Sequence, residues 1–200
     1  MQKGITVATW DINQGIQDNQ MRINKKHTVG LIIDIQERLF PHIHRNEKIA
    51  ANTRILIEGL KALEIPLLVT QQYTKGLGET IPGITEVLPD QQRIEKISFS
   101  CCDEPAFMKE LNQLDKEYVI VTGIEAHVCV LQTTLDLIEN GFVPVVVEDC
   151  VSSRKKRDHR VAIDRMRKEG IIITTCESIL FELCRYAGTE TFKQISMLVK

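Results

Sequence analysis

Residues 117–140, EYVIVTGIEAHVCVLQTTLDLIEN, combine the two patterns that decide the fold. The apolar run at residues 117–122 is rich in Val and Ile and predicts a buried strand. Residues 126–140 then place apolar side chains every three or four positions, which predicts a helix that ends at Gly141. A buried strand followed by a helix is the repeating unit of a parallel sheet covered by helices.

The same alternation recurs along the chain from Thr28 onward. The other expected strands are residues 28–34, 66–71, 92–97, 143–148 and 171–174. The other expected helices are residues 47–64, 104–114 and 156–169. We therefore expect an α/β, Rossmann-like fold of three layers: a doubly wound, mostly parallel six-stranded sheet with helices on both faces. Because residues 74–91 are rich in Gly and Pro, we expect them to form a long loop over the sheet edge.

The composition is that of a soluble globular chain with one domain. It has 200 residues, of which 43% are hydrophobic and 26% charged. We assign residues 25–200 to the domain and residues 1–24, which have no place in the sheet, to an N-terminal extension. The net charge of −2, with mixed signs, gives no support for capture of nucleic acid.

The location of the protein is inferred from its apolar runs and its cysteines. No apolar run approaches the roughly 20 residues of a membrane-spanning helix. The six cysteines have neither metal-knuckle spacing nor the density of a disulfide scaffold. We expect a cytoplasmic protein, without excluding import into an organelle.

Ligands of an open parallel sheet bind beyond the carboxyl ends of its strands, so polar residues at those ends are candidates for a site. Asp34 follows the apolar run at residues 29–33, where a carboxylate could act as a general base. A helix cap or a structural ion pair is the alternative. Lys96 lies among apolar residues and there needs an anion such as Asp34, unless it is a solvated surface lysine.

Cys129 lies in the first turn of the expected helix at residues 126–140. The positive end of a helix dipole and free backbone N–H groups lower the pKa of a thiol, which favours the attacking thiolate. The same N–H groups can hold the oxyanion that forms when a carbonyl is attacked. The alternative is an inert, packed cysteine.

Taken together, these segments resemble the isochorismatase-like cysteine hydrolases, a superfamily that includes nicotinamidases and N-carbamoylsarcosine amidases. The resemblance is carried, in order along the chain, by 31–36 (LIIDIQ), 69–73 (VTQQY), 95–100 (EKISFS), 121–129 (VTGIEAHVC), 148–154 (EDCVSSR) and 174–180 (TTCESIL). It covers nearly the whole domain. It implies the isochorismatase-like hydrolase fold and a cysteine-dependent amidohydrolase that cleaves a C–N bond of a small amide or ureido-type substrate through a thioester.

The resemblance also implies roles for particular residues. Asp34, Lys96 and Cys129 would be catalytic. The peptide bond between Ile124 and Glu125 would be cis, and the N–H groups of Glu125 and Cys129 would form the oxyanion hole. The residues expected in the substrate pocket are Gln36, Leu39, Tyr73 and Phe99.

The chain departs from the nicotinamidases in one motif. They have an Asp-x-His metal pair after the second strand, where this chain has Gln71, Gln72 and Tyr73. We therefore expect neither a metal nor a cofactor, and nicotinamide becomes a doubtful substrate. True isochorismatases split a vinyl ether without a cysteine nucleophile, so Cys129 points away from that reaction.

A subgroup of isochorismatase-domain-containing proteins is similar in the motifs 123–127 (GIEAH) and 75–78 (KGLG). The resemblance implies a homo-oligomer, a dimer or tetramer, that acts on a small-molecule substrate and binds neither nucleic acid nor a membrane. A family member that keeps the site but works in binding or assembly is the alternative function.

Other candidate groups have simpler explanations. His127 is two residues from Cys129, and side chains two apart on a helix do not face each other. His42 and His44 have no acidic or thiol partner at ligand spacing. The neighbours Cys101 and Cys102 cannot easily form an unstrained disulfide with each other. The basic run at 154–157 is typical of a solvated helix face, with a nuclease as a further alternative.

Overall fold

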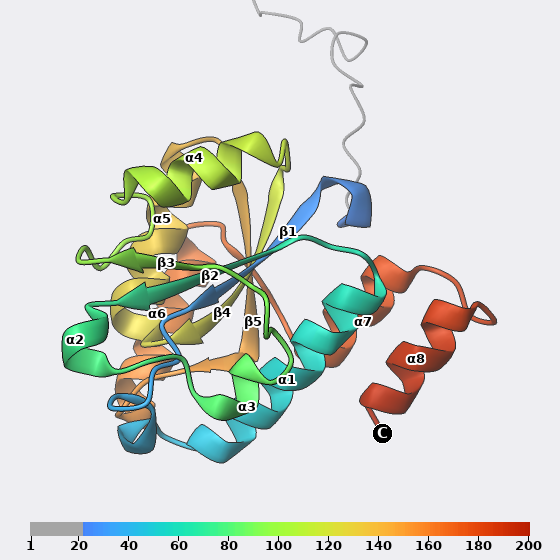
Figure 1. The fold of residues 1–200 in the computed structure, drawn as a ribbon. Helices are drawn as coiled ribbons and strands as arrows, with labels where there is room; N and C mark the ends of the chain where they lie inside the picture. Colours follow the sequence, from blue (N-terminus) through green and yellow to red (C-terminus); the bar gives the residue numbers. More distant parts are fainter. Residues whose placement is uncertain (1–21) are drawn as a thin grey trace, which may run out of the picture.

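Six parallel strands form the centre of the structure, a computed structural model that describes residues 22–200 (Figure 1). The strands are β1 (Thr28–Ile33), β2 (Leu67–Gln72), β3 (Arg93–Lys96), β4 (Tyr118–Ile124), β5 (Val143–Ser152) and β6 (Ile172–Thr174). Their order is β3-β2-β1-β4-β5-β6, and every neighbouring pair is parallel. The prediction of a six-stranded parallel sheet is confirmed, although β5 continues to Ser152, beyond the predicted end at residue 148.

Two layers of helices cover the sheet. One face carries α1 (Asn46–Ala62), α3 (Pro82–Thr85), α7 (Cys176–Cys184) and, outside α1 and α7, α8 (Glu190–Leu198). The other face carries α4 (Pro105–Gln113), α5 (Leu131–Glu139) and α6 (Lys156–Lys168). Four short elements complete the described chain: η1 (Lys25–His27), η2 (Phe40–His42), α2 (Thr74–Leu77) and η3 (Ala126–Val130), one turn of π-helix that leads into α5.

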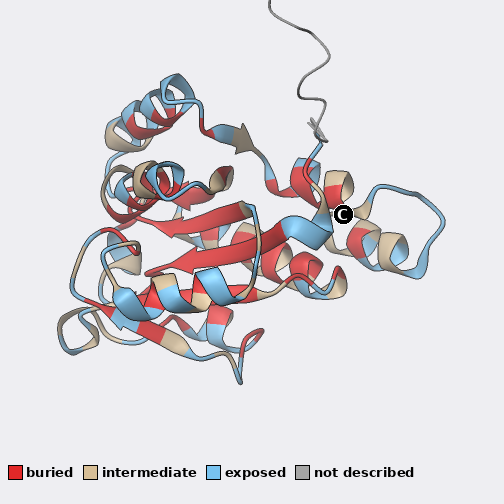
Figure 2. Ribbon diagram, turned by 90° about the horizontal axis from the view of Figure 1, so that it is seen from above, coloured by how far each residue is buried: buried red, intermediate tan, exposed pale blue. Residues whose placement is uncertain are grey.

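The sequence of each strand explains why helices cover both faces. Every residue of β1 is buried, and alternate side chains enter different cores: Leu31 packs with α4 and α5, and Ile32 packs with α1 and α7. Figure 2 shows the buried strands in red at the centre and exposed residues in pale blue on the outer sides of the helices. A strand that is apolar on both sides is stable only between two layers, which is why continuous Val and Ile runs predict this fold.

The strand order reverses between β1 and β4, and a glycine allows the two strands to approach there. Gly123 has φ +130, and a Cβ atom on it would lie 2.1 Å from the carbonyl oxygen of Ile33. Only glycine fits this position. The crevice at the carboxyl ends of β1 and β4 is therefore the expected ligand position in this topology.

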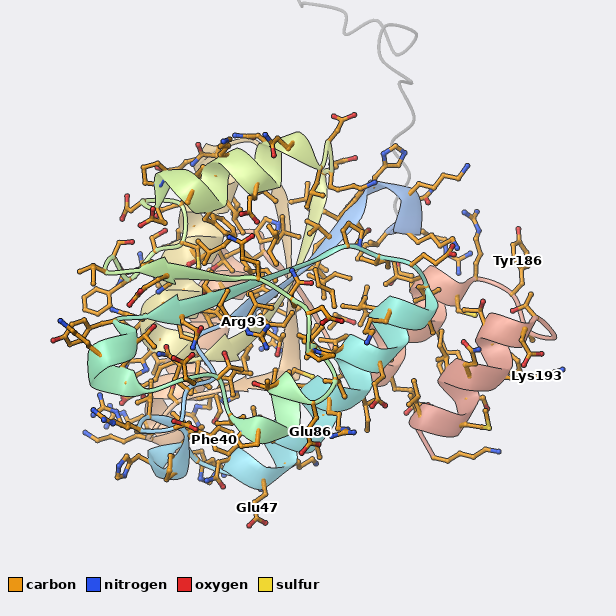
Figure 3. The ribbon with its side chains drawn as sticks, in the orientation of Figure 1. Phe40, Glu47, Glu86, Arg93, Tyr186 and Lys193 are labelled. Carbon is orange, nitrogen blue, oxygen red and sulfur yellow. The ribbon has the colours of Figure 1, made fainter. Side chains whose placement is uncertain are left out.

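Two parts of the chain differ from the prediction. Residues 74–91 contain α2 and α3, and four of their apolar residues are buried against the α1 side of the sheet: Ile81, Ile84, Val87 and Leu88. The expected long loop is therefore wrong, because these spaced apolar residues pack although Gly and Pro separate them. The helices α7 and α8 were not predicted. Figure 3 shows Tyr186 and Lys193 pointing outward at their end of the molecule.

The N-terminal boundary also differs. Residues 1–21 of the expected extension 1–24 lie outside the described residues. Ile23 is buried, and its N–H donates to Oε1 of Glu182 at 2.9 Å. The packed domain therefore includes Ile23, before the predicted start at residue 25. Among the helices of residues 22–200, none combines the length and apolar character that a membrane crossing requires.

Candidate active site

The sheet brings the three predicted catalytic side chains to one edge. Asp34 directly follows β1, Lys96 is the last residue of β3, and Cys129 lies in η3, just after β4. These strands are parallel, so their carboxyl ends meet at the same edge of the sheet. Residues far apart in the sequence thus become neighbours.

Asp34 and Lys96 form a buried ion pair. Nζ of Lys96 lies 2.6 Å from Oδ2 of Asp34, and each residue is only 1% exposed. The hydroxyl of Thr70 donates to Oδ1 of Asp34 at 2.8 Å. Lys96 is therefore not a solvated surface lysine. For Asp34 the ion pair fits both a structural and a catalytic role.

The ammonium group of Lys96 also donates to three further oxygens. These are the carbonyl oxygen of Ser98 at 3.1 Å, that of Phe99 at 3.2 Å, and Oε1 of Gln72 at 3.4 Å. Burial is the largest single influence and lowers the pKa of Lys96, but the charge and hydrogen bond of Asp34, together with Cys101 and Cys129, raise it by more, so the net shift is upward. Lys96 is thus a fixed positive charge in the site at neutral pH.

The thiol of Cys129 lies beside this pair and is 5% exposed. Its Sγ donates to Oε1 of Gln72 at 3.1 Å, the same atom that accepts from Lys96. Burial raises the pKa of Cys129 well above its ordinary value, and the charge of Asp34 raises it further, while Lys96 opposes both. The predicted lowering of this pKa is therefore wrong for the resting protein, because burial and the charge of Asp34 together outweigh the charge of Lys96.

The turn before Cys129 has an unusual backbone. The peptide bond between Ile124 and Glu125 is cis. The carbonyl oxygen of Glu125 accepts from the N–H groups of Val128 and Val130, and its carboxylate accepts from Nε of Arg154 at 3.1 Å.

The four residues predicted for the pocket occupy different positions. Tyr73 and Phe99 are 51% and 52% exposed, and they flank the end of β3. Leu39 is half-buried. Gln36 is fully buried, and both of its amide hydrogens are used, by the carbonyl oxygens of Gln72 and Gly78. Gln36 therefore holds the neighbouring chain segments and has no free N–H for a ligand.

Sequence reasoning missed two residues that contact the catalytic candidates. Thr70 and Gln72 are two apart on β2, so their side chains point to the same face of the strand. Thr70 contacts Asp34, and Gln72 contacts both Lys96 and Cys129. Two polar residues at alternate positions near the end of an apolar strand were the available signal.

The other polar candidates point elsewhere. Nε2 of Gln71 donates to Oε2 of Glu79 at 2.8 Å. Nδ1 of His127 lies 2.9 Å from Oγ of Ser153. Within residues 22–200, no three His, Cys, Asp or Glu side chains are grouped closely enough to hold a metal ion. All six cysteines, including Cys101 and Cys102, are free thiols.

The chain is similar to known proteins in both sequence and structure. Residues 28–178 match the isochorismatase domain. Isochorismatase family protein 1B of Dictyostelium discoideum is 36% identical over 173 residues, which are 84% of each chain. The structure of a protein described as MAR1 ribonuclease from Caenorhabditis elegans has a TM-score of 0.84 at 38% identity, covering 89% of this chain and 92% of that one.

A bacterial structure is also similar. The YcaC gene product of Escherichia coli, described as an octameric hydrolase of unknown specificity, has a TM-score of 0.83 at 25% identity, and the match covers 88% of each chain. The fold is thus shared with relatives from distant organisms.

Proposed function

Because the chain belongs to the isochorismatase family, we propose that it is a hydrolase that cleaves a C–N bond of a small amide or ureido-type substrate through a thioester on Cys129. Family membership supports a hydrolase, and we propose cleavage of a C–N bond because the chain resembles the amide-cleaving members of the superfamily. The observation that carries the proposal is the buried Asp34–Lys96 pair at 2.6 Å, with the Cys129 thiol beside it.

In the first half of the proposed reaction, Cys129 attacks the substrate carbonyl. Asp34 takes the thiol proton as Sγ bonds to the carbonyl carbon, and the carbonyl electron pair moves onto oxygen. The N–H groups of Glu125 and Cys129 stabilise this oxyanion. When the oxyanion collapses, the C–N bond breaks, and the leaving amine takes the proton from Asp34. The products are a thioester and ammonia or an amine.

Water completes the reaction. Asp34 removes a proton from a water molecule, whose oxygen attacks the thioester carbon. Collapse of the second tetrahedral intermediate breaks the C–S bond, and the Cys129 sulfur regains its proton from Asp34. The acyl group leaves as a carboxylic acid, or as a carbamic acid when the substrate is a ureido compound.

Lys96 and Gln72 position these groups. The contact of Lys96 with Asp34 orients the carboxylate and stabilises its charge between proton transfers. Gln72 keeps the thiol next to Lys96 through its shared oxygen. Because the pKa of Cys129 is raised in the resting protein, proton transfer to Asp34 accompanies attack and does not precede substrate binding.

The rim of the site favours a small substrate with an apolar portion. Tyr73, Phe99 and Ile97, which is 69% exposed, follow the carboxyl ends of β2 and β3, and we propose that they form an apolar edge there. We propose that this edge contacts the part of the substrate remote from the reacting carbonyl. Leu39 is a fourth residue that we propose for contact with the substrate. Gln36 supports the site indirectly, because its side chain is hydrogen-bonded to the backbone of Gln72.

The alternative is a weak family member that serves in binding or assembly. Its thiol would not form an acyl adduct, and its apolar rim would contact a partner. The Caenorhabditis elegans relative is described as a ribonuclease, but a polymer has poor access to a thiol that is 5% exposed. We therefore favour the small-molecule reaction.

We also propose a homo-oligomer, since the Escherichia coli relative is described as octameric.

The experiment is a screen for ammonia release from small primary amides, ureido compounds and nicotinamide. Cys129→Ala is the test variant, and Cys184→Ala is the matched control, because Cys184 contacts the carbonyl oxygen of Tyr186 and no residue of the site. The proposal requires turnover that Cys129→Ala abolishes and Cys184→Ala preserves. Ammonia release that survives in Cys129→Ala contradicts it. Because RNA cleavage releases no ammonia, the nuclease alternative is tested separately, by gel electrophoresis of RNA incubated with the protein.

A further inference from the structure

A second cavity lies apart from the Cys129 site. It has a volume of about 520 Å³ and is formed by the first turn of α1, the last part of β5, one side of α6 along most of its length and the N-cap residue of α7. These elements lie on the β5–β6 side of the sheet, while Cys129 contacts the β2 side. No residue of the candidate active site lines this cavity. Its volume is typical of pockets for small molecules.

The charge of the cavity is positive. Four of its cations form no ion pair with any residue in 22–200: Arg45, Lys48, Lys156 and Arg160. All four are exposed at the rim. Cations without a counter-ion around a cavity attract an anionic ligand.

The acidic residues of the cavity already have partners. Arg167 contacts Glu148 at 2.9 Å and Asp164 at 3.5 Å. Oδ1 of Asp149 accepts from the N–H of Cys176 at 2.8 Å. These three carboxylates are thus engaged within the protein, and the four rim cations are left for a ligand.

Two helices begin at the cavity and add to its positive potential. The N-caps of α1 and α6 are Arg45 and Lys155, and neither side chain accepts a hydrogen bond from its helix, although Oδ1 of Asn46 accepts one from the N–H of Glu47 in α1. Free N–H groups and the positive end of the dipole at such helix starts favour an anion. Glu47, the acidic residue in the first turn of α1, does not line the cavity and points outward in Figure 3.

An imidazole of the cavity has a donor or acceptor without a partner. Nε2 of His159 is buried and makes no hydrogen bond within the described residues. Burial lowers the pKa of His159, so the ring is neutral at physiological pH. The neutral ring therefore adds no positive charge to the cavity, whose charge comes from the rim cations.

The floor of the cavity is apolar. Ile49, Val151 and Ile163 are buried residues that line it. A simple ion would leave this surface uncovered, whereas an organic group would bury it. Together, these features point to a ligand that carries a strong negative charge on an apolar or aromatic body.

We propose that this cavity binds a small phosphate ester, with the phosphate among Lys48, Lys156 and Arg160 and the organic part on the apolar floor. A phosphate dianion has several acceptor oxygens, which suits several unpaired cations and two helix starts better than one carboxylate does. The phosphate could belong to a free small molecule or to the backbone of RNA, and we infer the small molecule because the cavity is bounded on several sides by α1, β5 and α6.

The test is titration calorimetry with adenosine 5′-monophosphate and inorganic phosphate as probes. Adenosine, which has the same organic part without the phosphate, is the control ligand. The variant Lys48→Gln/Arg160→Gln removes two rim charges. The control Arg165→Gln/Lys168→Gln removes the same charge from α6 outside the cavity. We expect the rim variant to weaken binding of the monophosphate at least about tenfold, because it loses two charge-assisted contacts. The control should change binding less than about twofold.

Several results would overturn the proposal. The first is that the wild type and the rim variant bind the monophosphate equally tightly. The second is that the wild type binds adenosine as tightly as the monophosphate. The third is that neither phosphate probe binds at about 10 mM. A short oligouridylate that binds while the monophosphate does not would assign the surface to RNA instead. Cys129→Ala should bind the monophosphate as the wild type does, so this test is independent of the proposed hydrolysis.

Discussion

Replacing Lys96 by Met would leave the Asp34 carboxylate buried without its cation. Methionine has a similar length and an apolar body, so the side chain can occupy the same space. Asp34 is 1% exposed and would keep the hydroxyl of Thr70 as a donor but no cation. Removal of one partner from a buried ion pair costs about 3 to 5 kcal/mol of unfolding free energy.

Replacement of the other partner of the ion pair, Asp34→Asn, should cost less unfolding free energy, about 1 to 3 kcal/mol. Lys96 would keep the carbonyl oxygens of Ser98 and Phe99 and Oε1 of Gln72 as acceptors. Asparagine also tolerates the left-handed backbone at this position, where φ is 53. The double variant has no buried charge and should be more stable than Lys96→Met by about 2 kcal/mol.

The assay is urea unfolding followed by far-UV circular dichroism at one fixed protein concentration, because association also affects apparent stability. All three variants should lack amide hydrolysis. The reasoning is refuted if Lys96→Met loses less than about 1 kcal/mol. It is also refuted if the double variant is no more stable than Lys96→Met alone.

Three further predictions concern the Cys129 thiol, the neighbouring side chain of Gln72, and the close approach of β1 and β4 at Gly123. The pKa of Cys129 is raised only in the folded chain. Above pH 9.0, the ordinary pKa of a cysteine, the thiol therefore loses its proton in the unfolded chain while it keeps it in the folded chain. Above that pH the wild type should lose stability relative to Cys129→Ala by up to about 1.4 kcal/mol per pH unit, measured by urea unfolding. Gln72→Leu removes the acceptor of the thiol and should lower kcat about tenfold without a change of fold, measured by steady-state kinetics. Gly123→Ala places a Cβ atom 2.1 Å from a backbone oxygen and should cost at least about 3 kcal/mol in the same unfolding assay.

Each of these predictions has a control. Below pH 9.0 the stability difference between the wild type and Cys129→Ala should be constant, and a slope there would contradict the raised pKa. For Gln72→Leu, an unchanged kcat would remove that residue from the reaction. Gly141 also has a positive φ, of 85, but a Cβ atom on it meets nothing within 4 Å. Gly141→Ala should therefore cost only about 1 kcal/mol, and equal losses in the two alanine variants would contradict the clash.

The sheet and the position of its functional edge could be predicted because they depend on local patterns. Runs such as residues 117–122 are apolar at successive positions, and only a doubly covered parallel sheet buries such runs. Asp34 was found because a polar residue directly after such a run lies at the ligand-binding edge, and Cys129 because it lies in the first turn of the helix that follows residues 117–122. The helices α7 and α8 were missed, since their stability comes from packing on α1 and not from a strong pattern of their own.

The electrostatics of the site could not be predicted from the sequence. The position of Cys129 in the first turn of a helix suggested a lowered pKa, but the depth of burial depends on how β1, β2 and β3 surround it. The contact of Gln72 with two catalytic candidates likewise depends on the register of β2 against β3, in which Gln72 pairs with Lys96. The sign of a pKa shift therefore requires the three-dimensional neighbours of the group.

The central claim is a covalent acyl intermediate on Cys129, and mass spectrometry of the rapidly quenched protein tests it directly. With an amide that the protein hydrolyses, the peptide containing Cys129 should gain the mass of the acyl group within the first turnover. Cys129→Ala should show neither the adduct nor ammonia release. Turnover without an adduct on Cys129, or turnover that persists in the alanine variant, would contradict the account.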